Sequence, residues 1–149
     1  MPIEPTQEQI AELTAIAGTD RDGPVVMLNL NRFHEEARYE EDPADGLSTD
    51  VSGAEAYGRY GAVALSVLER VGGRILWYTE AASTVIGDES SDLNEVVAVW
   101  YPSRAAFLDL ALAPDITVAL VHRRAGLERA TIICCPAATE PVLGILGAA

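Results

Sequence analysis

The fold of this chain is indicated first by residues 52–73, which read SGAEAYGRYGAVALSVLERVGG. Ser52 followed by Glu55 is the capping-box pattern that begins a helix. Large side chains then recur every three or four positions and form one stripe: Tyr57, Tyr60, Ala64, Val67, Leu68 and Val71. Gly72 and Gly73 end the pattern, as glycines often do at a helix C-terminus. The sequence therefore predicts an amphipathic helix whose stripe faces a core.

Strand patterns lie on both sides of this helix. Residues 25–30 are apolar on both faces, as in a strand that is buried between two layers. After the helix, residues 74–78 and 84–86 are rich in β-branched and aromatic side chains and predict one interrupted strand or two short ones. Residues 95–101 and 130–135 predict two further strands.

Helix signals fill the remaining intervals. Ser103 predicts the N-cap of a helix that continues to residue 112, and Pro114 separates it from a second helical segment at about 115–128. Near the start of the chain, the capping box of Thr6 and Gln9 predicts a short helix that ends at Gly18.

The order of these elements is β-α-β-β-α-β, the split arrangement of an α+β, ferredoxin-like fold. We expect one domain over residues 1–149, with the core at 20–136, an extra N-terminal helix at 1–19 and a C-terminal tail at 137–149. Two helices would cover one face of the antiparallel sheet. The strands are apolar on both faces, so we expect a second copy to cover the open face and form a dimeric α+β barrel. The apolar tail around Leu143, Ile145 and Leu146 should pack on this homodimer.

Composition restricts the classes of partner. The net charge is -13, from 23 acidic and 10 basic residues, so phosphate backbones and anionic membrane surfaces are repelled. We find no signal-peptide pattern and no apolar run of the roughly 18 residues that a membrane helix requires. Cys134 and Cys135 are adjacent and predict two buried free thiols. The sequence thus predicts a cytoplasmic protein that binds neither nucleic acid nor membrane.

Residues 32–52 form a polar, mostly acidic segment without a periodic pattern. A segment of about twenty such residues is long for a compact domain, which indicates either mobility or function. The least demanding interpretation is a solvated surface loop.

Common catalytic motifs are missing from the sequence. We find no G-x-G-x-x-G motif, Walker loop, C-x-x-C pair or H-E-x-x-H motif. His34 and His122 are the only histidines, so we predict no structural metal and no cofactor. A metal site formed by one histidine together with carboxylates is the alternative that stays open.

Several polar residues within apolar elements are candidate site residues. Asn29 lies in a strand that is otherwise apolar, and a buried amide must find a partner in the backbone or in a ligand. Tyr57 and Tyr60 lie one turn apart on the helix stripe, where they either pack in the core or contact a ligand. Arg32 leaves the first strand where the mouth of a site is expected.

His122, Arg123 and Arg124 form the one local concentration of positive charge. Arg123 falls on the apolar side of its helix, so it is either paired with a carboxylate or available to an anion. Favourable interaction with the helix C-terminus is the alternative explanation. His122 is suited to acid–base chemistry near neutral pH. We therefore predict an anion-binding corner of Arg123, His122 and Tyr60.

The sequence also resembles a known family, the domain of unknown function 1330 in its longer form, over residues 25–135. The resemblance is carried by short motifs in a fixed order: Met27-Leu28-Asn29-Leu30 with Arg32-Phe33, Ala56-Tyr57 with Tyr60-Gly61, Gly72-Gly73-Arg74, Tyr101-Pro102-Ser103-Arg104 with Phe107, and His122-Arg123 with Ala125-Gly126-Leu127. It implies a ferredoxin-like fold and a dimeric α+β barrel. Leu93-Asn94 and Ile116 depart from the pattern, where Trp-Asp and a tyrosine are expected.

Barrels of the kind that this resemblance implies include cofactor-independent monooxygenases, isomerases, haem-degrading enzymes and ligand-binding proteins, so the fold alone does not select a function. We predict a small-molecule pocket for an organic acid or aromatic compound, with His122 and Tyr60 as catalytic residues and with Asn29, Arg32, Tyr57 and Arg123 as binding residues. Haem is suggested by analogy alone, with His122 as its axial ligand. The alternative is a non-catalytic dimeric module, and whether the chain is an enzyme is left open.

Overall fold

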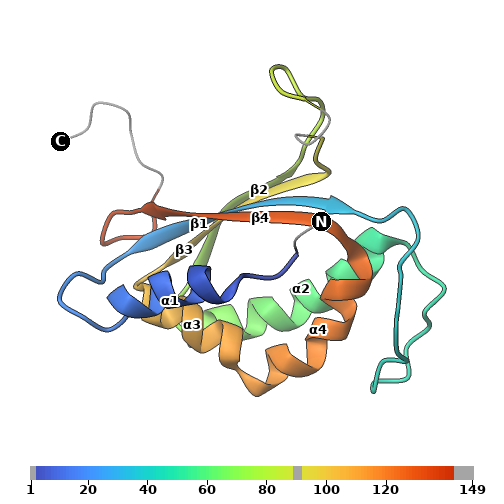
Figure 1. The fold of residues 1–149 in the computed structure, drawn as a ribbon, viewed down its shortest axis with the longest axis horizontal. Coiled ribbons are helices and arrows are strands. Elements are labelled where there is room, and N and C mark those ends of the chain that lie inside the picture. Colours follow the sequence, from blue (N-terminus) through green and yellow to red (C-terminus); the bar gives the residue numbers. More distant parts are fainter. Residues whose placement is uncertain (1–2, 89–91, 143–149) are drawn as a thin grey trace.

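The computed structural model describes residues 3–88 and 92–142 and has the ferredoxin-like α+β fold that the sequence predicts. Four antiparallel strands form one sheet in the order β2-β3-β1-β4, and the helices lie on one side of it (Figure 1). The strands are β1 (Val25–Phe33), β2 (Arg74–Glu80), β3 (Glu95–Tyr101) and β4 (Leu127–Pro136). The helices are α1 (Gln7–Ile16), α2 (Gly53–Arg70), α3 (Arg104–Leu112) and α4 (Pro114–Gly126).

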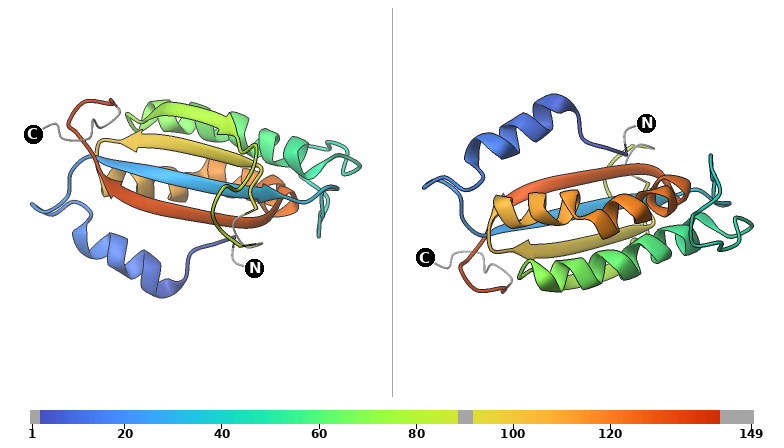
Figure 2. Two further views of the ribbon diagram at one scale, coloured as in Figure 1. Left: turned by 90° about the horizontal axis from the view of Figure 1, so that it is seen from above. Right: turned by 90° about the horizontal axis from the view of Figure 1, so that it is seen from below.

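Local capping signals begin the helices where the sequence predicts them. The Thr6 hydroxyl accepts from the backbone N–H of Gln9, whose side chain accepts in return from the backbone N–H of Thr6. Ser52 caps α2 and Ser103 caps α3 with a single contact each, in which the serine hydroxyl accepts from the N–H three residues later. The views in Figure 2 show α1 beside the β4 edge of the sheet, and none of its residues is buried.

The central strand β1 sets which residues share a face of the sheet. It pairs Val25 with Tyr101 of β3 and Asn31 with Glu95 of the same strand. Alternate residues of a strand point to opposite faces, so these partners all point to the helices. The core lies between this face and the helices, around the buried side chains Val25, Met27, Val67, Leu68, Val99, Tyr101 and Ile116.

Two predicted elements extend further than the structure shows. Residues 84–86 belong to no strand: β2 ends at Glu80, and Val85 and Ile86 are 90% and 94% exposed. β-Branched residues favour a strand through the neighbours they pack against, and none of the strands that the structure describes pairs with this segment. The last helix ends at Gly126 rather than at residue 128, because β4 begins pairing with β1 at Leu127. The helical break at Pro114 is confirmed, and α3 and α4 are bent by 76° relative to each other.

Helices α2 and α4 approach closely at two glycines. A Cβ atom on Gly126 would stand 2.5 Å from the carbonyl oxygen of Gly53 and 2.8 Å from the backbone nitrogen of Tyr57. A Cβ atom on Gly53 would stand 2.1 Å from the carbonyl oxygen of His34. Glycine at both positions therefore lets the first turn of α2 lie against the last turn of α4, which fixes the place of Tyr57.

No helix lies on the opposite face of the sheet in the described part of the chain (Figure 1). Apolar side chains of all four strands point to this open face: Val26, Leu28, Leu30, Trp77, Val96 and Ile133. Trp77 and Ile133 are exposed there. The segment that follows β2 projects on the same side, away from the helices (Figure 1). Of the apolar tail, Leu143, Ile145 and Leu146 lie outside the described residues.

Candidate functional site

A cluster of tyrosine rings lies between the sheet and the first turns of α2. The α2 stripe places Tyr57 and Tyr60 one turn apart, with their ring centroids 5.6 Å from each other. The ring of Phe33 at the end of β1 lies 5.2 Å from that of Tyr57. Tyr101 of β3 is only 5% exposed, and its phenol lies close enough to those of Tyr57 and Tyr60 for their charges to interact.

A hydrogen-bonded amide and carboxyl extend this cluster along the sheet. The Asn31 amide nitrogen, which is almost fully buried, donates to the Tyr57 hydroxyl at 3.3 Å and to the Glu95 carboxylate at 3.2 Å. Asn31 and Glu95 face each other in the register of β1 and β3, so the backbone itself brings the two side chains together. Burial raises the pKa of the Glu95 carboxyl, and the hydrogen bond from Asn31 partly opposes that shift.

The three phenols are poor acids in this environment. Burial, reinforced by the neighbouring Tyr60, raises the pKa of Tyr57 to about 12. Burial also raises the pKa of Tyr60, against the opposing charge of Arg123, and it raises the pKa of Tyr101. All three hydroxyls therefore keep their protons at neutral pH and are available as hydrogen-bond donors.

Two of these hydroxyls have no hydrogen-bond partner in the part of the chain that the structure describes. Among the described residues, no side chain or backbone group hydrogen-bonds the hydroxyl of Tyr60 or of Tyr101. Neither oxygen is one of the fully enclosed side-chain atoms without a partner, so each keeps some accessible surface. A ligand acceptor that hydrogen-bonds either hydroxyl would contribute about 0.5–1.5 kcal/mol net.

Arg123 brings positive charge to the cluster. Its guanidinium carbon lies 5.9 Å from the centroid of the Tyr60 ring, within the range of a cation–π contact. One of its nitrogens donates to the backbone carbonyl of Ile3, and the neighbouring Arg124 pairs with Glu4. The segment that precedes α1 therefore supplies Arg123 with a neutral carbonyl, and no carboxylate among the described residues is ion-paired with it.

His122, although adjacent to Arg123, contacts a different set of residues. Its Nδ1 lies 2.7 Å from the Tyr39 hydroxyl and its Nε2 lies 2.6 Å from Oδ2 of Asp45. Arg59 of α2 donates from Nη1 to the Tyr39 hydroxyl at 3.1 Å and to the Ser48 carbonyl at 2.7 Å. These contacts attach the acidic loop, residues 34–51, to α2 and α4. The sequence alone does not decide whether this segment is mobile or functional.

The other two candidate residues lie elsewhere. Asn29 points to the helix side but donates to the carbonyl of Met27 at 3.0 Å, the backbone alternative foreseen for it. Arg32 points to the open face of the sheet, where it pairs with Glu128 at 2.7 Å. The structure therefore brings together Tyr57, Tyr60 and Arg123, whereas Arg32 is on the opposite side of the sheet.

Sequence reasoning missed six residues of these two groups. Asn31, Glu95 and Tyr101 of the tyrosine cluster become visible only once the strand register pairs them, although Asn31 shares a strand face with Asn29. Tyr39, Asp45 and Arg59 meet His122 across a loop with no periodic pattern, so no sequence signal identifies them.

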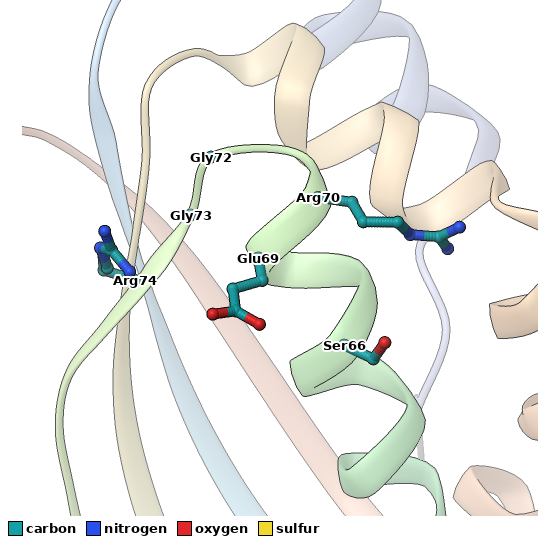
Figure 3. A pocket seen from close by; sticks show the side chains of 6 residues that line it. All are labelled: Ser66, Glu69, Arg70, Gly72, Gly73 and Arg74. Carbon is teal, nitrogen blue, oxygen red and sulfur yellow. The ribbon is translucent and has the colours of Figure 1, made fainter.

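An open depression of about 540 Å³ lies at the other end of α2, lined by Ser66, Glu69, Arg70, Gly72, Gly73 and Arg74 (Figure 3). The side chains of Arg70 and Arg74 extend to opposite sides of it. It is about 18 Å from Tyr57 along the helix, and none of the candidate residues lines it.

Within residues 3–88 and 92–142, no three His, Cys, Asp or Glu side chains could hold a metal ion together. In the same residues no single helix is long and apolar enough to cross a membrane, although the bent pair α3 and α4 passes that test by length and composition.

Comparison with known proteins agrees with this architecture. The family described as domain of unknown function (DUF1330) matches residues 47–135, which include α2, the sheet from β2 onward and α4. The chain belongs to the DUF1330 family. No functionally curated protein matches the chain.

Solved structures include a similar protein over nearly the whole length of this DUF1330 chain. RPA0582, a protein of unknown function from Rhodopseudomonas palustris, is 34% identical, with a TM-score of 0.77 over 91% of this chain and 97% of that one. Its methylated form is 36% identical, again with a TM-score of 0.77, over 92% and 96% of the two chains. A dabb family protein with a ferredoxin-like fold from Mesorhizobium loti is 15% identical, with a TM-score of 0.47, over 78% of this chain and 98% of that one.

Proposed function

We propose that this DUF1330 protein binds a small organic acid or aromatic compound in the tyrosine cluster of Tyr57, Tyr60, Tyr101, Asn31, Glu95 and Arg123. The observation that supports it most is the hydroxyl of Tyr101. It belongs to a residue that is 5% exposed, it lacks a protein partner among the described residues, and its oxygen is not one of the fully enclosed side-chain atoms. A core selected for stability alone would bond or remove such a group.

The chemistry of the cluster favours an anionic and partly aromatic ligand. The phenols of Tyr60 and Tyr101 are protonated donors, and Arg123 adds a positive charge beside them. A carboxylate accepts from both kinds of donor, and charge-assisted hydrogen bonds of this type are stronger than neutral ones. The ring faces of Phe33, Tyr57 and Tyr60 offer an apolar wall to the rest of the ligand.

Acid–base chemistry without a cofactor is the reaction type that this cluster supports. The raised pKa of Glu95 lets this carboxyl hold or release a proton closer to neutral pH, and Asn31 connects it to Tyr57. In this proposal Tyr60, which the sequence predicts to be catalytic, donates to a carbonyl or carboxylate oxygen of the ligand. His122 stands outside the cluster, because both of its ring nitrogens are bonded to Tyr39 and Asp45.

Thermal-shift titration with benzoate tests the binding site. Benzoate should raise the melting temperature of the wild type in a concentration-dependent way, whereas neutral benzyl alcohol should not. Arg123→Met should remove the benzoate effect and keep the fold. Arg124→Met is the matched control, because Arg124 is the adjacent arginine and makes only an exposed pair with Glu4 among the described residues. If benzoate and other small carboxylates leave the wild type unchanged and Arg123→Met mainly unfolds it, Arg123 is structural.

We further propose that the chain is a homodimer closed over the open face of the sheet. The apolar side chains of that face, among them Leu28, Trp77 and Ile133, support this, because no helix covers them in the described part of one chain. Light scattering at micromolar concentration should give twice the mass of the chain. Ile133→Glu should give a monomer, whereas Leu112→Glu, at an exposed position on the helix side, should leave the dimer intact. A monomeric wild type would exclude the dimer.

A non-catalytic interaction module is the second candidate function. It is favoured by Val85 and Ile86, which are almost fully exposed on the segment that projects beyond the sheet. Under this alternative the tyrosine cluster binds no ligand, and Val85→Ser with Ile86→Ser weakens assembly. A ligand-dependent thermal shift that persists in this double variant would favour the pocket.

A further inference from the structure

We propose that Tyr39, His122 and Asp45 form a second reactive site, in which Tyr39 is a nucleophile activated by His122 and directed at small acyl electrophiles. The three groups are connected in sequence by short hydrogen bonds. The Tyr39 hydroxyl meets Nδ1 of His122 at 2.7 Å, and Nε2 of His122 meets Oδ2 of Asp45 at 2.6 Å. This is the hydroxyl–imidazole–carboxylate order in which a histidine takes the proton of an attacking oxygen while a carboxylate orients the ring.

The protons in this network can be placed from its donors and acceptors. Arg59 Nη1 can only donate, so the Tyr39 oxygen accepts from it at 3.1 Å. With a neutral imidazole and an ionised Asp45, the carboxylate takes the proton on Nε2, which leaves Nδ1 as an acceptor. The single proton of Tyr39 therefore points at His122 Nδ1, and the second lone pair of the phenol oxygen is left for another atom.

Transfer of that proton leaves every hydrogen bond in place. After transfer, the imidazolium donates from Nδ1 to the phenolate and from Nε2 to Asp45, while Arg59 still donates to the same phenolate oxygen. No heavy atom has to move, and the new negative charge lies beside two cations. A site that satisfies both protonation states in one geometry is preorganised for the transfer.

Burial is distributed along the network as this chemistry requires. The His122 side chain is 5% exposed, so water does not compete for its ring nitrogens, whereas Asp45 is 45% exposed. Tyr39 is partly exposed and lies edge-on to the imidazole, with the ring centroids 5.7 Å apart. The tyrosine of the network is therefore partly exposed to solvent, and its base is shielded.

With an ester as the acyl electrophile, the reaction balances without a cofactor. The Tyr39 oxygen forms a bond to the acyl carbon, its proton passes to His122 Nδ1, and the bond from the acyl carbon to the leaving oxygen breaks. His122 returns the proton to that leaving oxygen. Water then attacks the aryl ester on Tyr39 while His122 takes a proton from it, and the bond from the acyl carbon to the Tyr39 oxygen breaks. His122 returns the proton to that oxygen, which releases the acid and restores the phenol. Arg59, next to the reacting oxygen, offsets negative charge at each stage.

The competing explanation is that the network only holds the loop of residues 34–51 on α2 and α4. Arg59 also donates to the Ser48 carbonyl, so the network does contact the loop at more than one point. A purely structural tie, however, requires no nucleophilic oxygen. The two explanations differ in the reactivity of Tyr39 relative to that of other tyrosines.

Labelling with an aryl sulfonyl fluoride measures that reactivity directly. In this reaction the phenol oxygen bonds to sulfur, the sulfur–fluorine bond breaks, fluoride leaves and the phenol proton goes to the base. Tyr78 is the internal reference, because it is 63% exposed and more accessible than Tyr39. N-acetyltyrosine amide in the same tube gives the rate of a free phenol. Peptide mass spectrometry then follows each tyrosine separately.

Tyr39 should be labelled about 10²-fold faster than the free phenol, the lower end of the range for a positioned general base. It should also exceed Tyr78. His122→Gln and Asp45→Asn should slow the labelling of Tyr39 and leave that of Tyr78 unchanged. Asp45 is half-exposed, so Asp45→Asn decides the matter if His122→Gln does not fold. The proposal is overturned if Tyr39 in the wild type is labelled no faster than Tyr78, or if Asp45→Asn leaves the labelling of Tyr39 unchanged. Neither outcome depends on a variant at the tyrosine cluster.

Discussion

Replacing Gly126 by alanine tests how tightly the α2–α4 contact determines the position of the tyrosine cluster. The new Cβ would lie 2.5 Å from the Gly53 carbonyl oxygen, 0.9 Å closer than the 3.4 Å at which ordinary contact begins, and 2.8 Å from the backbone nitrogen of Tyr57. Both obstacles are backbone atoms, so no side-chain rotation removes them. The helices must separate, which moves Tyr57 relative to Asn31.

The expected magnitude follows from two opposing effects. Overpacking of a close contact costs about 1–3 kcal/mol, and a clash with backbone on two sides belongs at the upper end of that range. Alanine in place of glycine at a helical position recovers up to about 1 kcal/mol. We therefore expect Gly126→Ala to lower the free energy of unfolding by about 2 kcal/mol, or about 4–8 °C in melting temperature for a chain of this size.

Urea denaturation followed by circular dichroism measures this change. The matched control is Gly58→Ala, in the interior of α2 at a position where a Cβ would meet nothing within 4 Å. It should raise the free energy of unfolding by about 0.5–1 kcal/mol, because it removes only the conformational freedom of the unfolded chain. A Gly126→Ala variant as stable as the wild type would falsify the reasoning, since it would mean that the two helices separate at no cost.

Two further predictions concern the carboxyls of Asp22, which is almost fully enclosed, and of Glu95, which is partly buried. Asp22, with a side chain only 5% exposed, accepts four backbone N–H groups, and two of them, at Arg104 and Ala105, begin α3. Asp22→Ala should lower the free energy of unfolding by about 2 kcal/mol in urea denaturation, whereas Asp115→Ala, in an exposed pair, should change it by about 0–1 kcal/mol. Burial by itself would raise the pKa of Asp22, but these hydrogen bonds lower it. The ionised Asp22 therefore stabilises the fold above about pH 4, and this stabilisation is lost as the pH falls through the lowered pKa of the folded state. Asp22→Asn should make the free energy of unfolding less dependent on pH in that range. Burial raises the pKa of Glu95, so ionisation of this carboxyl lowers the free energy of unfolding as the pH rises through the pKa of the folded state. Glu95→Gln should therefore stabilise the protein at pH 7 and not at pH 3. An equal effect at both pH values would contradict this.

The features of the fold that the sequence predicts correctly are those encoded by near neighbours. Ser52 and Ser103 cap their helices with the N–H three residues on, and the contact is complete within one turn. The strand at 95–101 is correct to the residue because its apolar run is bounded on both sides by polar or proline residues. The errors occur where a distant partner decides. Residues 84–86 have strand composition but pair with none of the described strands, and Leu127 leaves the helix because β1 is beside it.

The same distinction explains the candidate site. Tyr57, Tyr60 and Arg123 could be identified because helical periodicity alone shows which side of a helix they occupy. Asn31 and Glu95 could not, because their contact depends on the register between β1 and β3. Tyr39 and Asp45 contact a histidine about eighty positions later, through a loop whose path no local pattern determines.

Consecutive residues of α4 serve the two groups of polar side chains. An α-helix turns by about 100° per residue, so His122 and Arg123 point in different directions from one backbone segment. His122 meets the loop of residues 34–51, and Arg123 meets Tyr60 and the segment before α1. The consecutive residues Arg59 and Tyr60 of α2 likewise belong to different groups, because Arg59 donates to Tyr39 whereas Tyr60 lies under Arg123. A displacement of α4 against α2 therefore disturbs both groups, whereas a substitution at one of these four side chains disturbs one. Benzoate binding that survives Asp45→Asn, together with Tyr39 labelling that survives Arg123→Met, would establish that the two groups act independently.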